Sequence, residues 1–153
     1  MSVDVFLDTN VLIYAVSSSP AEAEKKERVL DLISHTDFGL SAQVLQEFYV
    51  NVTSKIALPL MPDDALELLE QFKSFPMVWS DYPLIVSGIE KALRFGVSYW
   101  DGAIIAAAER LGATTLYTED LNHGQRYGSV VAVNPFQPST PDAAHESQEP
   151  SYG

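Results

Sequence analysis

The chain alternates short apolar runs with longer segments in which apolar residues recur every three or four positions. The first run, Val3 to Leu7, is apolar except at Asp4 and is followed at once by polar residues, which predicts a strand buried in a parallel sheet. Further short strands are predicted in "DFGLS", "PMVWSD", "ATTLYT" and "SVVAVN", the last two separated by a polar loop, "EDLNHGQRYG". Helical segments lie between the strands. This alternation predicts an α/β fold with a mostly parallel sheet of about five short strands flanked by helices.

Helix start signals place the second helical segment. Ser19 is an expected N-cap and Pro20 an expected first helical residue. The apolar spacing then predicts that Val29, Leu30 and Ile33 are buried.

The later helices follow the same logic. "AQVLQEFYVNVTSKIAL" is predicted as a helix with Glu47 at the edge of its apolar face, and Pro62 is predicted to open the next one. A further helix is expected to start at Tyr82 or Pro83 and to stop at Gly96. Its inward residues are predicted to be Leu84, Ile85, Ile89 and Leu93.

Composition indicates one domain. The 153 residues, 46% of them hydrophobic, suffice for a single core, which we assign to residues 1–136. Residues 137–153 turn to Pro, Ser, Gln and acids, and are predicted to be a disordered acidic tail. The chain has no cysteine, no basic-then-apolar leader and no apolar run long enough to cross a membrane. A cytoplasmic protein without a membrane partner is expected.

The formal net charge of −12 argues against a protein whose main task is to hold nucleic acid, because a basic surface is the usual signature of phosphate binding. Cleaving nucleic acid is a different task, however. The charge alone therefore excludes neither a nuclease nor another enzyme.

Asp8 interrupts the apolar stretch "VFLDTNVLIYAV" at the expected end of the first strand. One interpretation is a cap for the helix that begins near Thr9 or Asn10. The other is a ligand-binding acid, because open α/β sheets bind ligands outside the carboxyl ends of their strands. Both interpretations stay open.

Three further acids have similar alternatives. Asp101 starts on the core-facing side of a helix, yet it also has the spacing of a capping partner for Ser98. Asp120 follows the strand "ATTLYT" beside Glu119, where a solvated loop acid is the alternative. Glu47 alone would be an ordinary exposed helix residue.

In a parallel sheet these four acids converge at one edge. Carboxylates gathered there without compensation repel one another, so raised pKa values or bound cations are expected. With no Cys and no nearby His, the oxygen ligands favour Mg²⁺, with Mn²⁺ as a substitute, over zinc.

Four motifs in order, "FLDTNVLIY", "AQVLQEFYV", "SYWDGAIIAAAERLGATTLYTEDL" and "VVAVNPF", resemble those of the PIN-domain nucleases, and among these the VapC-like toxins of type II toxin–antitoxin pairs. The resemblance runs from about Val3 to Phe136. It implies a Rossmann-like sheet, a Mg²⁺-dependent endoribonuclease acting on RNA, a cognate antitoxin and a homodimer.

The resemblance also assigns residues. The acids that it implies as metal ligands and catalytic residues are Asp8, Glu47, Asp101 and Asp120. The family's T-x-D spacing selects Asp120 rather than Glu119 and places a conserved hydroxyl at Thr118. A polar residue after the first acid falls on Thr9 or Asn10. Arg126, in the loop after Asp120, is a candidate phosphate contact, with an exposed surface arginine as the alternative.

Other functions remain to be weighed. A PIN nuclease that processes RNA without being a toxin would share every one of these residues. A haloacid-dehalogenase-like phosphatase also uses a strand-end Asp, but it wants a second acid two residues on, where this chain has Asn10. A PIN-like scaffold that only binds a partner would not need all four acids.

Overall fold

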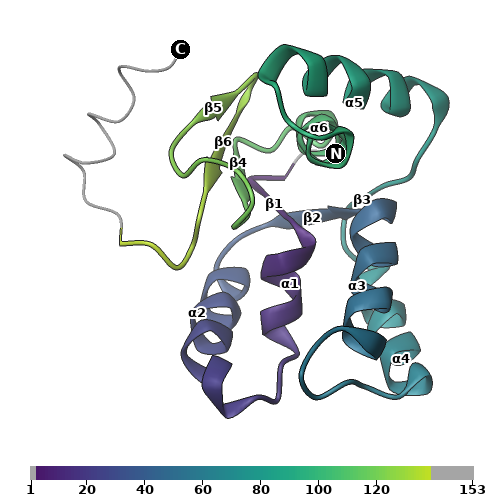
Figure 1. Cartoon of the computed structure of the whole chain (residues 1–153), viewed down its shortest axis with the longest axis vertical. Helices are drawn as coiled ribbons and strands as arrows, with labels where there is room; N and C mark the ends of the chain where they lie inside the picture. Colours follow the sequence, from purple (N-terminus) through teal and green to yellow (C-terminus); the bar gives the residue numbers. More distant parts are fainter. Residues whose placement is uncertain (1–2, 139–153) are drawn as a thin grey trace.

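The computed structural model describes residues 3–138, which form a six-stranded sheet between two groups of helices (Figure 1). The strand order is β3-β2-β1-β4-β6-β5, and every neighbouring pair is parallel except β5 with β6. The strands are β1 (Val5–Leu7), β2 (Phe38–Ser41), β3 (Met77–Val78), β4 (Thr115–Tyr117), β5 (Arg126–Tyr127) and β6 (Val130–Val133). The predicted α/β fold is confirmed, and its five predicted strands are all present.

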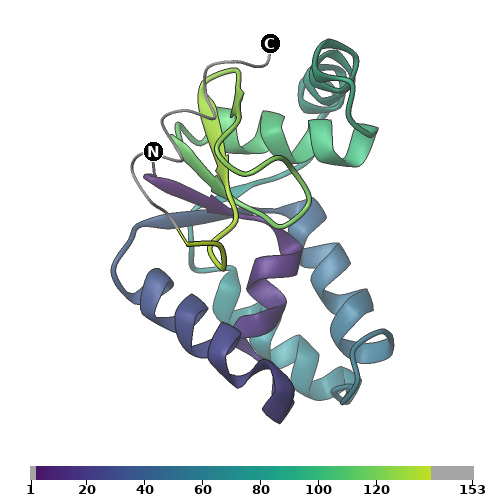
Figure 2. The same cartoon turned by 60° about the vertical axis from the view of Figure 1, so that its left-hand side comes forward.

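The helices lie on both faces of this sheet (Figure 2). They are α1 (Thr9–Ala15), the 3-10 helix η1 (Pro20–Glu22), α2 (Ala23–Ser34), α3 (Ala42–Ser54), α4 (Pro62–Phe72), α5 (Tyr82–Phe95) and α6 (Tyr99–Arg110). Helices α1 to α4 cover one face, and α6 covers the other with α5 outside it. The chain leaves β1 on one side and enters β4 from the opposite side. The gap between these neighbours is a topological switch point, where open α/β sheets bind their ligands.

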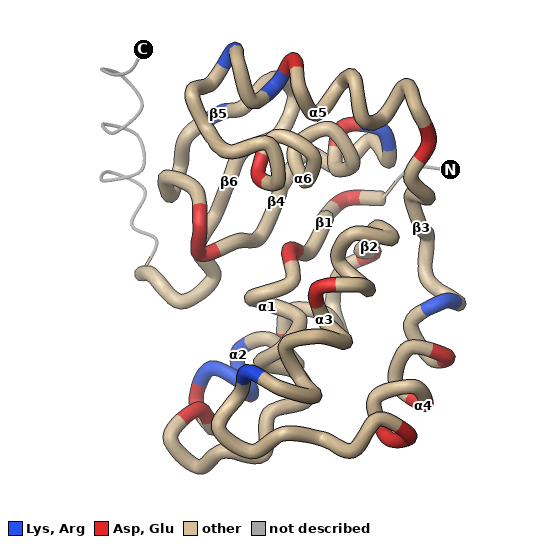
Figure 3. Tube along the Cα trace, turned by 45° about the vertical axis from the view of Figure 1, so that its right-hand side comes forward, with Lys and Arg blue, Asp and Glu red and all other residues tan. Residues whose placement is uncertain are grey.

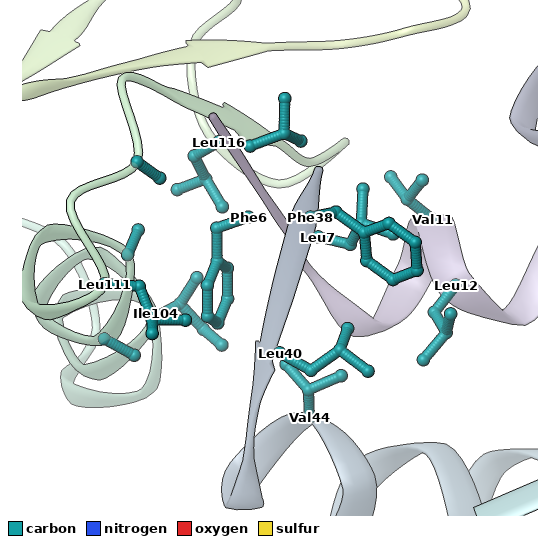
Figure 4. Close-up of a cluster of buried hydrophobic side chains, with 14 of the residues drawn as sticks. Phe6, Leu7, Val11, Leu12, Phe38, Leu40, Val44, Ile104, Leu111 and Leu116 are labelled. Carbon is teal, nitrogen blue, oxygen red and sulfur yellow. The ribbon is translucent and has the colours of Figure 1, made fainter. Parts of the chain in front are cut away.

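Side chains from alternate positions of β1 build a core on each face of the sheet (Figure 4). Phe6 points towards Ile104 of α6, while Leu7 points towards Val11 and Leu12 of α1. All but Ile104 are completely buried, and Ile104 is nearly so. Burial of each such side chain stabilises the fold by roughly 1.5–3 kcal/mol. The core therefore fixes β1 from both sides, and with it the residue that follows.

Helices α5 and α6 approach each other through glycines. A Cβ atom on Gly102 would collide with the carbonyl oxygen of Gly88 and lie 2.8 Å from the backbone nitrogen of Ala92. A Cβ atom on Gly88 would lie 3.1 Å from the Cα atom of Ala103. Only small residues permit this contact, so the small side of α5 faces inward.

This packing corrects the predicted orientation of α5. Leu84 is buried as predicted, but Ile85, Ile89 and Leu93 are 42%, 45% and 80% exposed. Apolar periodicity identified the helix, whereas the glycine contact decided which of its two sides lies against α6.

Smaller differences concern helix α2 and the strands. Leu32 is buried in place of Leu30, and Ser19 precedes η1 without making a side-chain cap. Strand β1 begins at Val5 rather than Val3. The predicted polar loop after β4 contains the short strand β5, which includes Arg126.

Two further predictions concern the acidic tail and the absence of a membrane-spanning segment. Of the predicted acidic tail, residues 139–153 lie outside the described residues. No helix within residues 3–138 is long and apolar enough to cross a membrane.

Candidate active site at the carboxyl edge of the sheet

Asp8 and Thr118 lie side by side at the switch point. The register pairs Leu7 with Tyr117, so the next residue of each strand stands at the carboxyl edge. The Thr118 hydroxyl donates to Asp8 Oδ2 at 2.7 Å, and the backbone N–H of Thr9 donates to Asp8 Oδ1 at 2.7 Å. Asp8 is also the N-cap of α1. The two interpretations of this acid are thus compatible, since it caps the helix and faces the edge.

Burial dominates the electrostatics of Asp8. Asp8 is only 5% exposed, and the loss of hydration on burial raises the pKa of its carboxyl group from 3.8 to about 7. The hydrogen bonds from Thr118 and Thr9 oppose the rise, while the carboxylates of Asp120 and Glu47 add to it. Without bound metal, this carboxyl group therefore keeps its proton to a higher pH than an ordinary aspartate does.

Glu47 is held by two side chains on helix α3 and at the start of α1. Its Oε1 accepts from the Thr9 hydroxyl at 2.8 Å, and its Oε2 accepts from Gln43 Nε2 at 3.1 Å. The same Gln43 nitrogen lies 3.2 Å from the carbonyl oxygen of Trp100. Gln43 therefore ties Glu47 to the start of α6, where Asp101 follows.

Asp101 occupies the first turn of α6. Its backbone N–H donates to the Ser98 hydroxyl at 3.1 Å, so the expected N-cap is present. Partial burial raises the pKa of its carboxyl group, and the charges of Asp120 and Glu47 raise it further, against a hydrogen bond with Ser98. Asp101 is accordingly both part of a cap and a neighbour of the other acids.

Asp120 is anchored through its backbone. Its N–H donates to the Thr118 hydroxyl at 3.0 Å, the same hydroxyl that donates to Asp8. Its negative charge raises the pKa values of both Asp8 and Asp101. The side chain of Asp120 is therefore within electrostatic reach of both.

Glu119 is directed elsewhere. Its Oε1 accepts from the Tyr14 hydroxyl at 3.2 Å and its Oε2 from Lys25 Nζ at 3.2 Å. Its backbone N–H donates to Asn10 Oδ1 at 3.2 Å. Asn10 thus fixes the loop after β4, whereas Thr9 contacts the acids directly.

Arg126 does not reach this edge. It pairs with Val131, which pairs with Thr115 at the start of β4, and β6 separates its strand from β4. Its side chain is exposed. The register therefore places it away from the four acids, on the outermost strand.

Two contacts at this edge were missing from the sequence prediction. Gln43 lies four residues before Glu47 on the same helix face, which is the signal that could have identified it. Lys25 has no such signal, because its contact with Glu119 joins residues 94 positions apart.

The donor set suits a hard cation. Hydrogen bonds fix the oxygens of Asp8 and Glu47, and none of the five ion pairs within residues 3–138 involves the four acids. In that same range, no three His, Asp or Glu side chains come close enough together to surround one ion. Binding of one ion by all four acids would therefore require their side chains to come closer together than they are in this structure.

Solved structures with this fold are similar over most of the chain. FitAcB from Neisseria gonorrhoeae is 25% identical, with a TM-score of 0.59 over 88% of this chain and 99% of that one. A toxin–antitoxin complex from Klebsiella pneumoniae gives 14% identity and a TM-score of 0.65 over 88% of this chain and 100% of that one. VapC20 from Mycobacterium tuberculosis, titled a sarcin–ricin loop cleaving toxin, gives 16% identity and a TM-score of 0.59 over 76% of this chain and 90% of that one.

Comparison with curated protein sequences yields no match. The family model of the PIN domain matches residues 5–128, which include all four acids and Thr118. The chain therefore belongs to the PIN domain family.

Proposed function

We propose that this protein is a Mg²⁺-dependent endoribonuclease and the toxin of a toxin–antitoxin pair. The observation that carries the proposal is a group of acids at the carboxyl edge of a PIN domain, in which the charges of Glu47 and Asp120 raise the pKa values of Asp8 and Asp101 and none of the four forms an ion pair within residues 3–138. Similar structures add support, since one is of a toxin that cleaves the sarcin–ricin loop and another is of a toxin–antitoxin complex.

The chain's own residues have distinct tasks in this proposal. Asp8 is the fixed point, because both of its oxygens accept hydrogen bonds. Thr118 orients Asp8 and, through the backbone of Asp120, the loop that carries the fourth acid. Glu47 is oriented by Thr9 and Gln43.

Asp8, Glu47, Asp101 and Asp120 would hold the ion. A bound Mg²⁺, or Mn²⁺ in its place, supplies Lewis acidity that activates water and offsets charge on a phosphodiester. The raised pKa of Asp8 fits this role, because a cation favours the carboxylate that burial disfavours.

The test is cleavage of a panel of defined tRNA and rRNA fragments by the purified chain with Mg²⁺, with Mn²⁺ and with EDTA. We expect cleavage that EDTA abolishes and that added Mg²⁺ restores. The same ions should raise the melting temperature, since a ligand that binds only the folded state stabilises it. Cleavage that persists in EDTA would overturn the metal dependence, and intact RNA throughout would overturn the function.

A protein partner is proposed for the apolar cleft beside α1, α2 and α4. Its volume is about 420 Å³, and it is lined largely by aromatic and aliphatic side chains, among them Leu12, Ile33, Phe72 and Phe75. Such a cleft suits an apolar segment of an antitoxin. Expression with the neighbouring reading frame should yield a small protein that co-purifies and silences cleavage. Cleavage without any such partner would favour an RNA-processing nuclease instead.

We also propose a homodimer that uses the outer face of α5. Tyr82, Ile85, Ile89 and Leu93 form an exposed apolar stripe with spacings of three, four and four residues. A stripe of this kind can pack on its own copy across a two-fold axis. Ile89→Glu should convert a dimer to a monomer in light scattering, whereas a monomeric parent protein would contradict the proposal.

A haloacid-dehalogenase-like phosphatase receives less support. The place of the second acid is taken by Asn10, which accepts a hydrogen bond from the backbone of Glu119.

A further inference from the structure

An open cleft of about 490 Å³ separates helix α2 from the segment that follows β6. Its lining residues are Glu24, Lys25 and Arg28 from α2, and Pro135, Phe136, Gln137 and Pro138 from the opposite wall. The charged lining residues are thus two basic side chains and one acidic one, in a protein whose formal net charge is −12. Helix α2 carries the basic residues Lys25, Lys26 and Arg28 among the acids Glu24, Glu27 and Asp31, and Figure 3 shows both kinds of position there.

Lys25 connects this cleft to the proposed active site. Its Nζ lies 3.2 Å from both Glu119 Oε2 and the Tyr14 hydroxyl, and Glu119 directly precedes Asp120. The ammonium group also stands 4.8 Å from the ring centroid of Tyr14 and 4.9 Å from that of Phe136. Its side chain nevertheless remains 43% exposed. Lys25 is therefore pre-positioned by several contacts while it stays open to a ligand.

Arg28 is fixed at a different point of the cleft. Its Nε donates to the carbonyl oxygen of Pro135 at 3.0 Å. Within residues 3–138 its two terminal nitrogens make no hydrogen bond, so they are available to a ligand. A guanidinium held through one nitrogen can still present the others to phosphate oxygens.

We propose that Lys25 and Arg28 bind the phosphodiester backbone of single-stranded RNA beside the scissile bond, so that the substrate reaches the acids along this cleft. The inference rests on the proposed ribonuclease function. Four carboxylates repel a polyanion such as RNA, so its approach needs a positive charge nearby. Lys25 is close to them, because it contacts Glu119, the residue before Asp120. A phosphate can take the place of the Glu119 carboxylate on Lys25, because each offers negatively charged oxygens to the ammonium group.

The first experiment compares Lys25→Ala with Lys73→Ala. Lys73 is a matched control, since it is also a solvent-accessible lysine paired with a glutamate, Glu70, but at the C-terminal end of α4. Lys25→Ala should raise KM for RNA roughly tenfold with kcat within about twofold, and Lys25→Arg should restore most of the loss. The slope of log K against log salt should fall by about 0.7 for the lost phosphate contact. Equal KM values and salt slopes for Lys25→Ala and Lys73→Ala would overturn the proposal.

The second experiment separates a phosphate contact from a merely structural lysine. Glu119→Gln releases Lys25 from its ion pair and should lower KM for RNA. If the ion pair is merely structural, Glu119→Gln and Lys25→Ala should instead change KM in the same direction, because each breaks the pair. The gain should vanish in the Lys25→Ala background. A gain that persists there would mean a general charge effect and would overturn the role of Lys25.

Failure of the inference can be distinguished from failure of the proposed function. Binding of a fluorescein-labelled RNA of about 20 nucleotides is measured by anisotropy in the Asp8→Asn background, where no cleavage is expected. If the parent protein cleaves RNA but Lys25→Ala changes neither binding nor KM, only the proposal that RNA binds in this cleft is overturned. A parent protein that neither binds nor cleaves RNA overturns both proposals.

Discussion

Two groups of acids in this molecule have opposite electrostatic environments. At the carboxyl edge, burial and neighbouring carboxylates raise the pKa values of Asp8 and Asp101. At the ends of α5 and α6 the pKa values of Asp81 and Glu109 are lowered. For Asp81 the main cause is its hydrogen bond with Arg110; for Glu109, bonds from Lys91 and Ser129 outweigh the effect of burial.

The difference separates acids that stabilise the fold through ion pairs from acids that the fold buries at a cost in stability. The Lys91–Glu109 pair, at 2.7 Å, joins α5 to α6, and the Arg110–Asp81 pair, at 2.9 Å, joins the end of α6 to the start of α5. Asp8 instead opposes folding whenever it is charged, because its own contacts do not repay its desolvation. Acids that cost stability in this way cluster at functional sites.

The largest expected effect comes from changing carboxylate to amide in each group. Asp8→Asn should reduce RNA cleavage by more than about 100-fold, because even the hydrogen-bonding partners of metal ligands are worth about 10- to 100-fold. Asp81→Asn, the matched control, should leave cleavage within about twofold. Initial rates on one RNA substrate measure both. Similar cleavage rates for the two variants would mean that the acids at the carboxyl edge matter no more for activity than those at the ends of α5 and α6.

Thr118 tests whether the edge acids depend on uncharged partners. Thr118→Val keeps the shape of the side chain but removes the hydroxyl that bonds Asp8 and the Asp120 backbone. Cleavage should fall by about 10- to 100-fold, and more Mg²⁺ should be needed for half-maximal activity. Thr118→Ser, which retains the hydroxyl, is the control and should keep most of the activity. A valine variant with an unchanged Mg²⁺ requirement would argue against orientation by Thr118.

Asp8 should also leave a mark on stability without divalent cations. Its folded-state pKa of about 7 exceeds the ordinary 3.8, so the folded state retains a proton that the unfolded state releases between these pH values. The contribution of Asp8 to stability therefore falls as pH rises from about 4 to 7, by up to about 4 kcal/mol, and is constant above that range. The stability of Asp8→Asn minus that of the parent should rise over this window in urea titrations. A difference that does not change with pH would mean an ordinary pKa for Asp8.

The smallest effect on the free energy of unfolding is expected at Glu109. Its replacement should destabilise the fold, whereas replacement of Asp8 should stabilise it. Glu109→Gln removes the acceptor of Lys91 and weakens the bonds from Ser129, and should lower the free energy of unfolding by about 1 kcal/mol at neutral pH. Because the folded-state pKa is lowered, this contribution is present above the unfolded pKa and lost as pH falls through the folded one. Thermal melts at pH 7 and pH 3 check it, with cleavage unchanged. A Glu109→Gln variant more stable than the parent protein would contradict the conclusion that Glu109 stabilises the fold.

The sequence allowed the fold to be predicted, and with it the positions of Asp8 and Asp120, for a physical reason; the assignment of Glu47 and Asp101 to the same site rests also on the family resemblance and stays a prediction. Asp8 and Asp120 follow strands, and the carboxyl ends of parallel strands meet at one edge whatever the details of packing. Asp8 interrupts an apolar stretch, and Asp101 starts on the core-facing side of its helix. The place of Asp8 and Asp120 at this edge therefore depended on little more than strand order.

Packing decided what the sequence could not. Helix α5 has large apolar residues on one side and small ones on the other, and periodicity alone favoured burying Ile85, Ile89 and Leu93. The close approach of Gly88 and Gly102 buries the small side instead. Likewise, Arg126 was assigned to a loop because a strand of two residues has no pattern of its own.

The site is assembled from distant parts of the chain, since Asp8 and Thr118 are 110 residues apart in sequence yet share a hydrogen bond. During synthesis on the ribosome, β1 is made well before its neighbour β4 and the loop with Asp120. Under the proposed function, a partly synthesised chain is therefore harmless to the RNA around it. Enzymatic competence arrives only with the last strands, when a folded domain is also ready for its inhibitor.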